Sequence, residues 1–272
     1  MSAKEEQNSL TAEEALSLWL TVPRLPISKR ERRILDAAEN FTLPFHGHMP
    51  PGGDFELPVT AWDEKERPLV LLVHGWGGHR AQLAGFVKPL TAAGFRVASF
   101  DAPAHGDVPG TQASGYQIAE AMHAVVDKVG MPYAVIAHSL GTMSVTVALE
   151  DWLKPQRLVF FGPMRRLEDT LVPFLKMNHL PEEMAPDVRA TTEEVFGADV
   201  WRHTSLDLIL PRIEIPALIF HDRDDETTPY ISGVGVARAW PSARLVTTHG
   251  LGHRGALKDA NVIQQVVEFI RS

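Results

Sequence analysis

Near the middle of the chain stands the sequence Tyr133-Ala-Val-Ile-Ala-His-Ser-Leu-Gly141. Its first five residues are apolar or β-prone, which predicts a short buried strand, and a helix-forming segment follows at once. Ser139 lies at the junction, where a sharp turn requires small residues two positions before and two positions after it. Ala137 and Gly141 meet this requirement. The pattern predicts a serine held on a tight strand-to-helix turn, although serine is also an ordinary helix N-cap.

The same alternation of strand and helix continues on both sides of this turn. Apolar strand-like runs are followed by helix-forming segments such as His79–Ala93 and 114–129, which predicts a mostly parallel sheet covered by helices on both faces. One interval, 162–216, contains no convincing strand. Insertions at such a point of a sheet usually lie over the carboxyl ends of the strands, so a helical lid is expected there. The other strand-like runs are 69–73, 95–100, 157–161, 217–220 and 243–248.

A serine needs a base to remove its proton, and the base needs a third group to orient it. His221-Asp-Arg-Asp-Asp225 follows one predicted strand, and His249-Gly-Leu-Gly-His253 follows the last one. The order Ser139, Asp225, His253 is the chain order of one known arrangement of the Ser-His-Asp triad. Asp222 and Asp224 compete with Asp225 for the role of the acid.

Four motifs in this order resemble those of the serine α/β-hydrolases of the esterase, lipase and acyl-hydrolase kind, over residues 55 to 272. His74-Gly-Trp-Gly-Gly78 is similar to the family's oxyanion loop, and Asp101-Ala-Pro-Ala-His-Gly106 to its Asp-x-x-Gly-x-Gly loop. The serine turn and the two segments that carry Asp225 and His253 complete the set. The resemblance implies the α/β-hydrolase fold, a working triad, and an oxyanion hole formed by the backbone amides of Trp76 and Leu140.

The expected organisation places a helical lid inside a hydrolase core. Met164, Phe174 and Met177 of the lid are candidate walls of a substrate pocket, although a helix core would use the same residues. An apolar stripe of Leu16, Trp19 and Leu20 opens the chain and predicts docking onto the main body, with a dimer contact or a flap over the site as alternatives. The segments are a helical extension at 1–54, the core at 55–161 and 211–272, and the lid at 162–210.

Composition excludes several classes of protein. The net charge of −8 disfavours nucleic-acid binding, and the absence of cysteine excludes thiolate metal sites and a cysteine nucleophile. Neither a membrane-spanning run nor a secretory signal is evident, so a cytoplasmic location is expected. His46-Gly-His48 is too weak a motif to indicate a metal site. No metal or organic cofactor is expected.

The expected activity is hydrolysis of a small or medium carboxylic ester, or a thioester, through an acyl-enzyme on Ser139. The same residues also suit C–C bond hydrolysis, lyase chemistry or perhydrolysis, because these reactions can share the triad. A binding protein that kept the fold and lost catalysis is an alternative of another class, since fold does not imply function.

Overall fold

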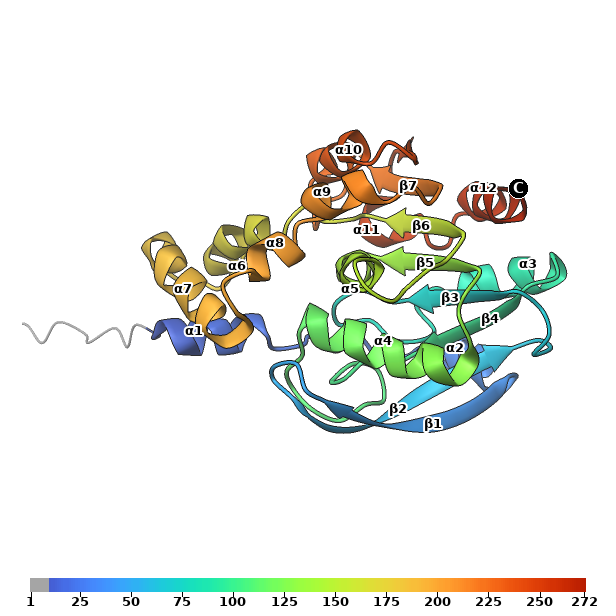
Figure 1. Ribbon diagram of the computed structural model, residues 1–272, viewed down its shortest axis with the longest axis horizontal. Helices are drawn as coiled ribbons and strands as arrows, with labels where there is room; N and C mark the ends of the chain where they lie inside the picture. The colour runs from blue at the N-terminus through green and yellow to red at the C-terminus, as the bar shows by residue number, and fades with distance from the viewer. Residues whose placement is uncertain (1–9) are drawn as a thin grey trace, which may run out of the picture.

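The computed structural model describes residues 10–272, and one eight-stranded sheet forms its centre (Figure 1). The strand order is β1-β2-β4-β3-β5-β6-β7-β8. Strand β2 is antiparallel to both of its neighbours, and every pair from β4 to β8 is parallel, which confirms the predicted mostly parallel sheet. The strands are β1 (Glu39–Gly47), β2 (Gly53–Trp62), β3 (Leu69–Val73), β4 (Arg96–Phe100), β5 (Ala134–His138), β6 (Arg157–Phe161), β7 (Ala217–Asp222) and β8 (Ala243–Thr248).

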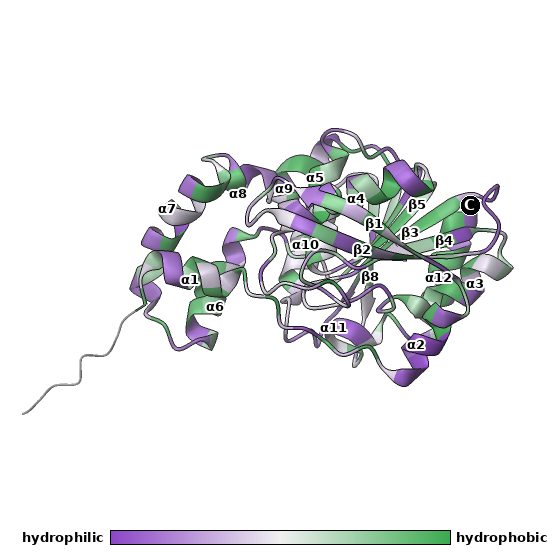
Figure 2. Cartoon of the chain, turned by 90° about the horizontal axis from the view of Figure 1, so that it is seen from below, coloured by the Kyte–Doolittle hydropathy of each residue, from purple (hydrophilic) through white to green (hydrophobic). Residues whose placement is uncertain are grey.

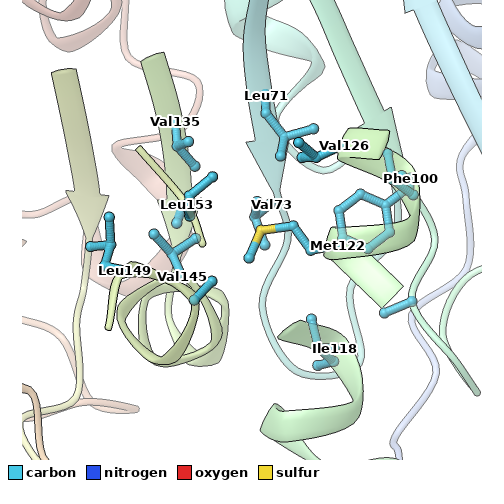
Figure 3. Close-up of a cluster of buried hydrophobic side chains, with 14 of the residues drawn as sticks. Leu71, Val73, Phe100, Ile118, Met122, Val126, Val135, Val145, Leu149 and Leu153 are labelled. Atoms are coloured by element: carbon cyan, nitrogen blue, oxygen red, sulfur yellow. The ribbon is translucent and has the colours of Figure 1, made fainter. Parts of the chain in front are cut away.

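Helices cover both faces of the sheet because its central strands are apolar on both sides. In β3, Leu71 and Val73 belong to one hydrophobic cluster, whereas Val70 and Leu72 belong to the other. Figure 3 shows the first cluster, where Met122 and Val145 from two helices meet the strands. The first face carries α4 (Gly115–Val129), α5 (Leu140–Leu149), α9 (Leu206–Ile209) and α10 (Tyr230–Ala239); the second carries α2 (Lys29–Asp36), α3 (Val87–Ala92) and α12 (Ala260–Arg271).

A separate helical lobe stands apart from the sheet in both views (Figures 1 and 2). It has a small core of its own, in which Ala15 and Leu16 of the first helix pack against Leu171, Leu175 and Val188. The predicted docking of the N-terminal apolar stripe is therefore made onto the segment 162–210 and not onto the sheet. The helices of the lobe are α1 (Ala12–Trp19), α6 (Leu171–Met177), α7 (Ala185–Phe196) and α8 (Val200–His203).

Both expected N-terminal helices are present. Thr11 with Glu14, and Ser28 with Glu31, form reciprocal capping boxes at the starts of α1 and α2. Residues 1–9 of the expected extension lie outside the described part of the chain.

Two expectations about secondary structure were wrong. A helical extension is expected at 1–54, yet 39–47 is the edge strand β1. Its odd positions, Phe41, Leu43 and Phe45, alternate with more polar residues, and Pro44 is tolerated because an edge strand leaves amides unpaired. The helix expected over His79–Ala93 begins only at Val87, after a short helical turn at Ala84–Phe86.

The residues before α3 are bonded to other loops. The amide of Arg80 donates to Asp101, and the side chain of Gln82 accepts from the amide of Gly75. Both bonds hold residues 80–82 against loops at the carboxyl end of the sheet.

Candidate active site

Ser139 occupies a strained backbone position between β5 and α5. Its φ is +53° and its ψ is −124°, a combination that a non-glycine residue rarely adopts. Its amide donates to the carbonyl of Phe161, and its own carbonyl accepts from Thr142, so the turn is held from two sides. Its hydroxyl makes no capping bond to α5. An ordinary N-cap does not explain this serine, because a cap has extended backbone and bonds its own helix.

Small residues let neighbouring loops approach this turn. A Cβ added at Gly141 would lie 2.5 Å from the carbonyl oxygen of His74. One added at Gly75 would lie 2.9 Å from the Cβ of Ser139. The segment that follows β3 is therefore packed directly against the serine.

His253 and Asp225 meet at the same end of the sheet. The Nδ1 of His253 lies 2.8 Å from Oδ2 of Asp225, and the amides of Thr227 and Thr228 donate to the other carboxylate oxygen. Burial raises the pKa of Asp225, but the hydrogen bond from His253 and those from the two amides outweigh it, so that the pKa lies below its usual value. The carboxylate thus stays ionised beside the imidazole.

His253 also contacts His138, the residue before Ser139. Its ring lies 4.6 Å from that of His138, centroid to centroid, and the Nε2–H of His138 donates to the carbonyl of His253 over 2.9 Å. Because His138 directly precedes Ser139 in the chain, its contact with His253 joins the two loops that carry the predicted nucleophile and base.

The competing carboxylates have other partners. Asp222 accepts from the hydroxyl of Thr248 and from the amide of Leu251, and Asp224 accepts from the amide of Gly250. These bonds join the loop that carries the three aspartates to the loop that precedes His253. Of the three aspartates, Asp225 is the one whose carboxylate bonds His253.

The loop after β3 forms a tight turn in which Gly78 donates to the carbonyl of Gly75 over 2.9 Å. Gly77 has a φ of +70° at the third position of this turn, a conformation that favours glycine. The indole of Trp76 lies edge-on to His105, with ring centroids 5.1 Å apart. Within residues 10–272 no hydrogen bond uses the amide of Trp76 or of Leu140.

Two of the three proposed pocket residues, Phe174 and Met177, belong to α6 of the helical lobe. Phe174 packs against Trp19 with ring centroids 5.9 Å apart, inside the core of the lobe. Met177 is 75% exposed, and Met164 packs against the sheet's first cluster. The helix-core interpretation accounts for Phe174.

Gly162 was not singled out from the sequence, although it directly follows the strand β6. Its φ is +51°, and an added Cβ would lie 3.2 Å from Nδ1 of His253 and 3.3 Å from Oδ2 of Asp225. A glycine directly after a predicted strand was the available signal.

Gly162→Ala is expected to lower kcat by about tenfold, because a methyl group would displace the His253–Asp225 pair by a few tenths of an ångström. Gly197→Ala is the matched control, since Gly197 also has a positive φ, of +92°, but no atom within 4 Å of an added Cβ. Both variants should lose stability from backbone strain, and only the first should lose activity. Equal kcat values for the two variants would contradict this expectation.

Several histidines are buried in their neutral form. Burial lowers the pKa of His105 to about 3 and that of His138 to about 3, and it also lowers the pKa of His74 and of His221. In His105, Nδ1 bonds the carbonyl of Pro103, and Nε2 is buried without a partner among the described residues. These rings shape the loops around Ser139 without carrying charge.

The unfolding free energy is expected to fall as the pH drops below 6.5. A histidine with a pKa of about 3 when folded and 6.5 when unfolded binds its proton mainly in the unfolded chain between these values. The unfolding free energy is therefore highest above pH 6.5. Below that pH it declines by about 1.4 kcal/mol per pH unit for each such histidine. Urea unfolding at pH 7.5, 6.0 and 5.0 measures this slope. His105→Asn keeps a donor for the carbonyl of Pro103. It should reduce the slope of the unfolding free energy against pH by about 1.4 kcal/mol per pH unit, the contribution of one proton. A slope equal to that of the wild type would show that His105 titrates normally.

The described residues hold no group of three or more histidine, cysteine, aspartate or glutamate side chains that could bind a metal ion. His46 instead bonds Asp54, at 2.6 Å. None of the helices formed by residues 10–272 has the length and apolarity required to span a bilayer.

Comparison with known proteins agrees with the fold. The model of a family described as serine aminopeptidase, S33 matches residues 64–206, and that of a TAP-like protein family matches residues 198–272. The chain belongs to the α/β-hydrolases of the serine aminopeptidase S33 family. The expected α/β-hydrolase fold and the expected class of enzyme, a hydrolase, are thereby confirmed.

The individual relatives match either a short part of this chain or most of it at low sequence identity. A pimeloyl-[acyl-carrier protein] methyl ester esterase from Methylococcus capsulatus is 40% identical over 30% of each chain. A bifunctional esterase/perhydrolase from Acinetobacter calcoaceticus is 24% identical over 78% of this chain and 94% of the relative. The solved structure of an esterase from Pyrococcus furiosus has a TM-score of 0.66 at 17% identity, covering 92% of this chain and 98% of that one, and supports the fold.

Proposed function

We propose that the protein is a serine hydrolase that cleaves a carboxylic ester or thioester of small to medium size. The observation that carries this proposal is the His253–Asp225 hydrogen bond, linked through His138 to a serine with a φ of +53°. An imidazole oriented by a buried carboxylate is suited to accept a proton, and a strained turn presents a hydroxyl for attack. The similarity to two esterases supports an ester as the substrate.

In the proposed reaction Ser139 Oγ attacks the carbonyl carbon while His253 takes the hydroxyl proton. The carbonyl oxygen becomes an oxyanion that accepts hydrogen bonds from the amides of Trp76 and Leu140, which have no other acceptor among the described residues. The protonated His253 then donates to the departing alcohol or thiol, which leaves an acyl-enzyme. Water, deprotonated by His253, attacks the acyl carbon, and the carboxylic acid is released as Ser139 regains its proton.

Perhydrolysis is a second candidate, favoured by the similarity to a bifunctional esterase/perhydrolase over most of both chains. Hydrogen peroxide would replace water in the attack on the acyl-enzyme and release a peracid. The ratio of peracid to carboxylic acid formed from one ester, measured with increasing peroxide, tests this activity.

Covalent labelling tests the primary proposal. A fluorophosphonate probe should modify the protein once, at Ser139, and peptide mapping locates the adduct. A ladder of p-nitrophenyl esters then gives the preferred acyl length, and amino-acid p-nitroanilides test amide cleavage, which the family's description as aminopeptidase suggests. A folded protein that is neither labelled nor active on any ester would contradict the proposal and favour a binding function.

A further inference from the structure

Residues 20–25, named here the strap, connect the helical lobe to the loop that carries Trp76. The strap begins directly after α1, whose Ala15 and Leu16 are buried against α6 and α7. Figure 1 shows α1 beside α7, with the chain continuing from there toward the sheet. One end of the strap is therefore anchored in the lobe core.

Hydrogen bonds join the strap to the loop 108–113. The amide of Val22 donates to the carbonyl of Thr111 over 2.8 Å, and the amide of Ala113 donates to the carbonyl of Leu20 over 3.0 Å. The guanidinium of Arg24 donates to the carbonyls of Val108 and Gly110. This loop follows directly after the Asp101–Gly106 segment that contains His105, the ring that contacts Trp76.

The other end of the strap holds the turn around Trp76 and Gly77. The amide of Leu25 donates to the carbonyl of Gly77 over 2.9 Å. A Cβ at Gly77 would lie 2.0 Å from the carbonyl oxygen of Pro23, so the two backbones are in direct contact. Val22 is 7% exposed and packs with Ala104 and Ala113 in a small cluster to which Trp76 also belongs.

We infer that Val22 and Leu25 are positioning residues of the oxyanion hole, and this rests on the proposed role of the Trp76 amide. The Trp76 N–H belongs to the Gly75–Trp76 peptide group, whose orientation depends on the packing of the Trp76 ring and on the tight turn from Gly75 to Gly78 that contains it. Trp76 packs against the cluster that contains Val22, and its ring contacts that of His105. Leu25 bonds the Gly77 carbonyl, two peptide groups after the one that contains the Trp76 amide. Because oxyanion donors act mainly in the transition state, a shift of this loop should change kcat more than KM.

The strap also links this turn to the lobe. Trp19 at the end of α1 contacts Phe174 of α6, one residue before the strap begins. The lobe and the oxyanion donor are thus joined by a short backbone path that does not pass through the sheet.

Val22→Ala is the first test, with kcat and KM measured on the best p-nitrophenyl ester. The expected result is a kcat about tenfold lower with an unchanged KM, because a small misplacement of one donor is sufficient. The affinity for a trifluoromethyl ketone, which forms an oxyanion when Ser139 adds to it, should fall by the same factor. Val262→Ala is the matched control: Val262 is 3% exposed in α12, on the opposite face of the sheet, and its loss should lower stability without changing kcat.

Arg24→Met is the second test, because Arg24 is exposed and its replacement should not prevent folding. Loss of its bonds to Val108 and Gly110 should loosen the strap and lower kcat by a few-fold, again without a change in KM.

If both variants keep the kcat of the control, or change KM alone, the positioning role is contradicted. If the wild-type protein hydrolyses no ester, the proposed function is contradicted, and so is the role of the strap that rests on it. An active wild type with unresponsive variants contradicts the strap alone.

Discussion

Replacement of Ser139 by alanine is expected to lower kcat for ester hydrolysis by about 10⁶-fold, because loss of the proposed nucleophile would remove the covalent step on which the rest of the proposed triad acts. Binding and the oxyanion donors would leave only a small residual rate. The fold should survive, because the backbone at Ser139 is held by bonds from its amide and carbonyl and not by its hydroxyl. The measurements are kcat, fluorophosphonate labelling and the unfolding midpoint.

Ser99→Ala provides the matched control for this experiment. Ser99 is 1% exposed in β4, and its hydroxyl has no hydrogen-bond partner among the described residues. The control should keep both labelling and activity. If folded Ser139→Ala retained more than a few per cent of the wild-type kcat, another residue would be the nucleophile.

Asp225→Asn is expected to lower kcat by about 10⁴-fold. An amide in place of the carboxylate can present its NH₂ group to Nδ1 of His253, which favours the wrong tautomer and removes the charge that stabilises the imidazolium. The amides of Thr227 and Thr228 should still hold the side chain, because the amide oxygen can replace Oδ1 as their acceptor. The loss should therefore appear in kcat with little change in secondary structure.

The neighbouring aspartates are the controls for Asp225. Asp224→Asn should have little effect on kcat, since its carboxylate is bonded to Gly250 and not to His253. Asp222→Asn should lower stability, because Asp222 is 2% exposed and joins β7 to the loop that precedes His253. If either variant lost more activity than Asp225→Asn, the assignment of the acid would be wrong.

Much of the core and part of the site could be predicted from local sequence. The run 133–137, the small residues Ala137 and Gly141, and the succession of strands and helices each depend on periodicity or on steric demands within a few residues. The capping boxes of α1 and α2 are of the same kind. The position of Ser139 between a strand and a helix follows from these local patterns, as do the candidate segments for the acid and the base.

The tertiary structure decided what depends on partners distant in the chain. Asp222, Asp224 and Asp225 are chemically alike and nearly adjacent, and only the loop made by Thr227 and Thr228 directs one of them to His253. Strand β1 exists because β2 pairs with it, although its alternation was visible in the sequence. The packing of Trp76 against the cluster that contains Val22, and of α1 against α6 and α7, joins segments separated by many residues. Local propensity carries no information about such contacts, because their free energy appears only when the folded chain brings both partners out of water.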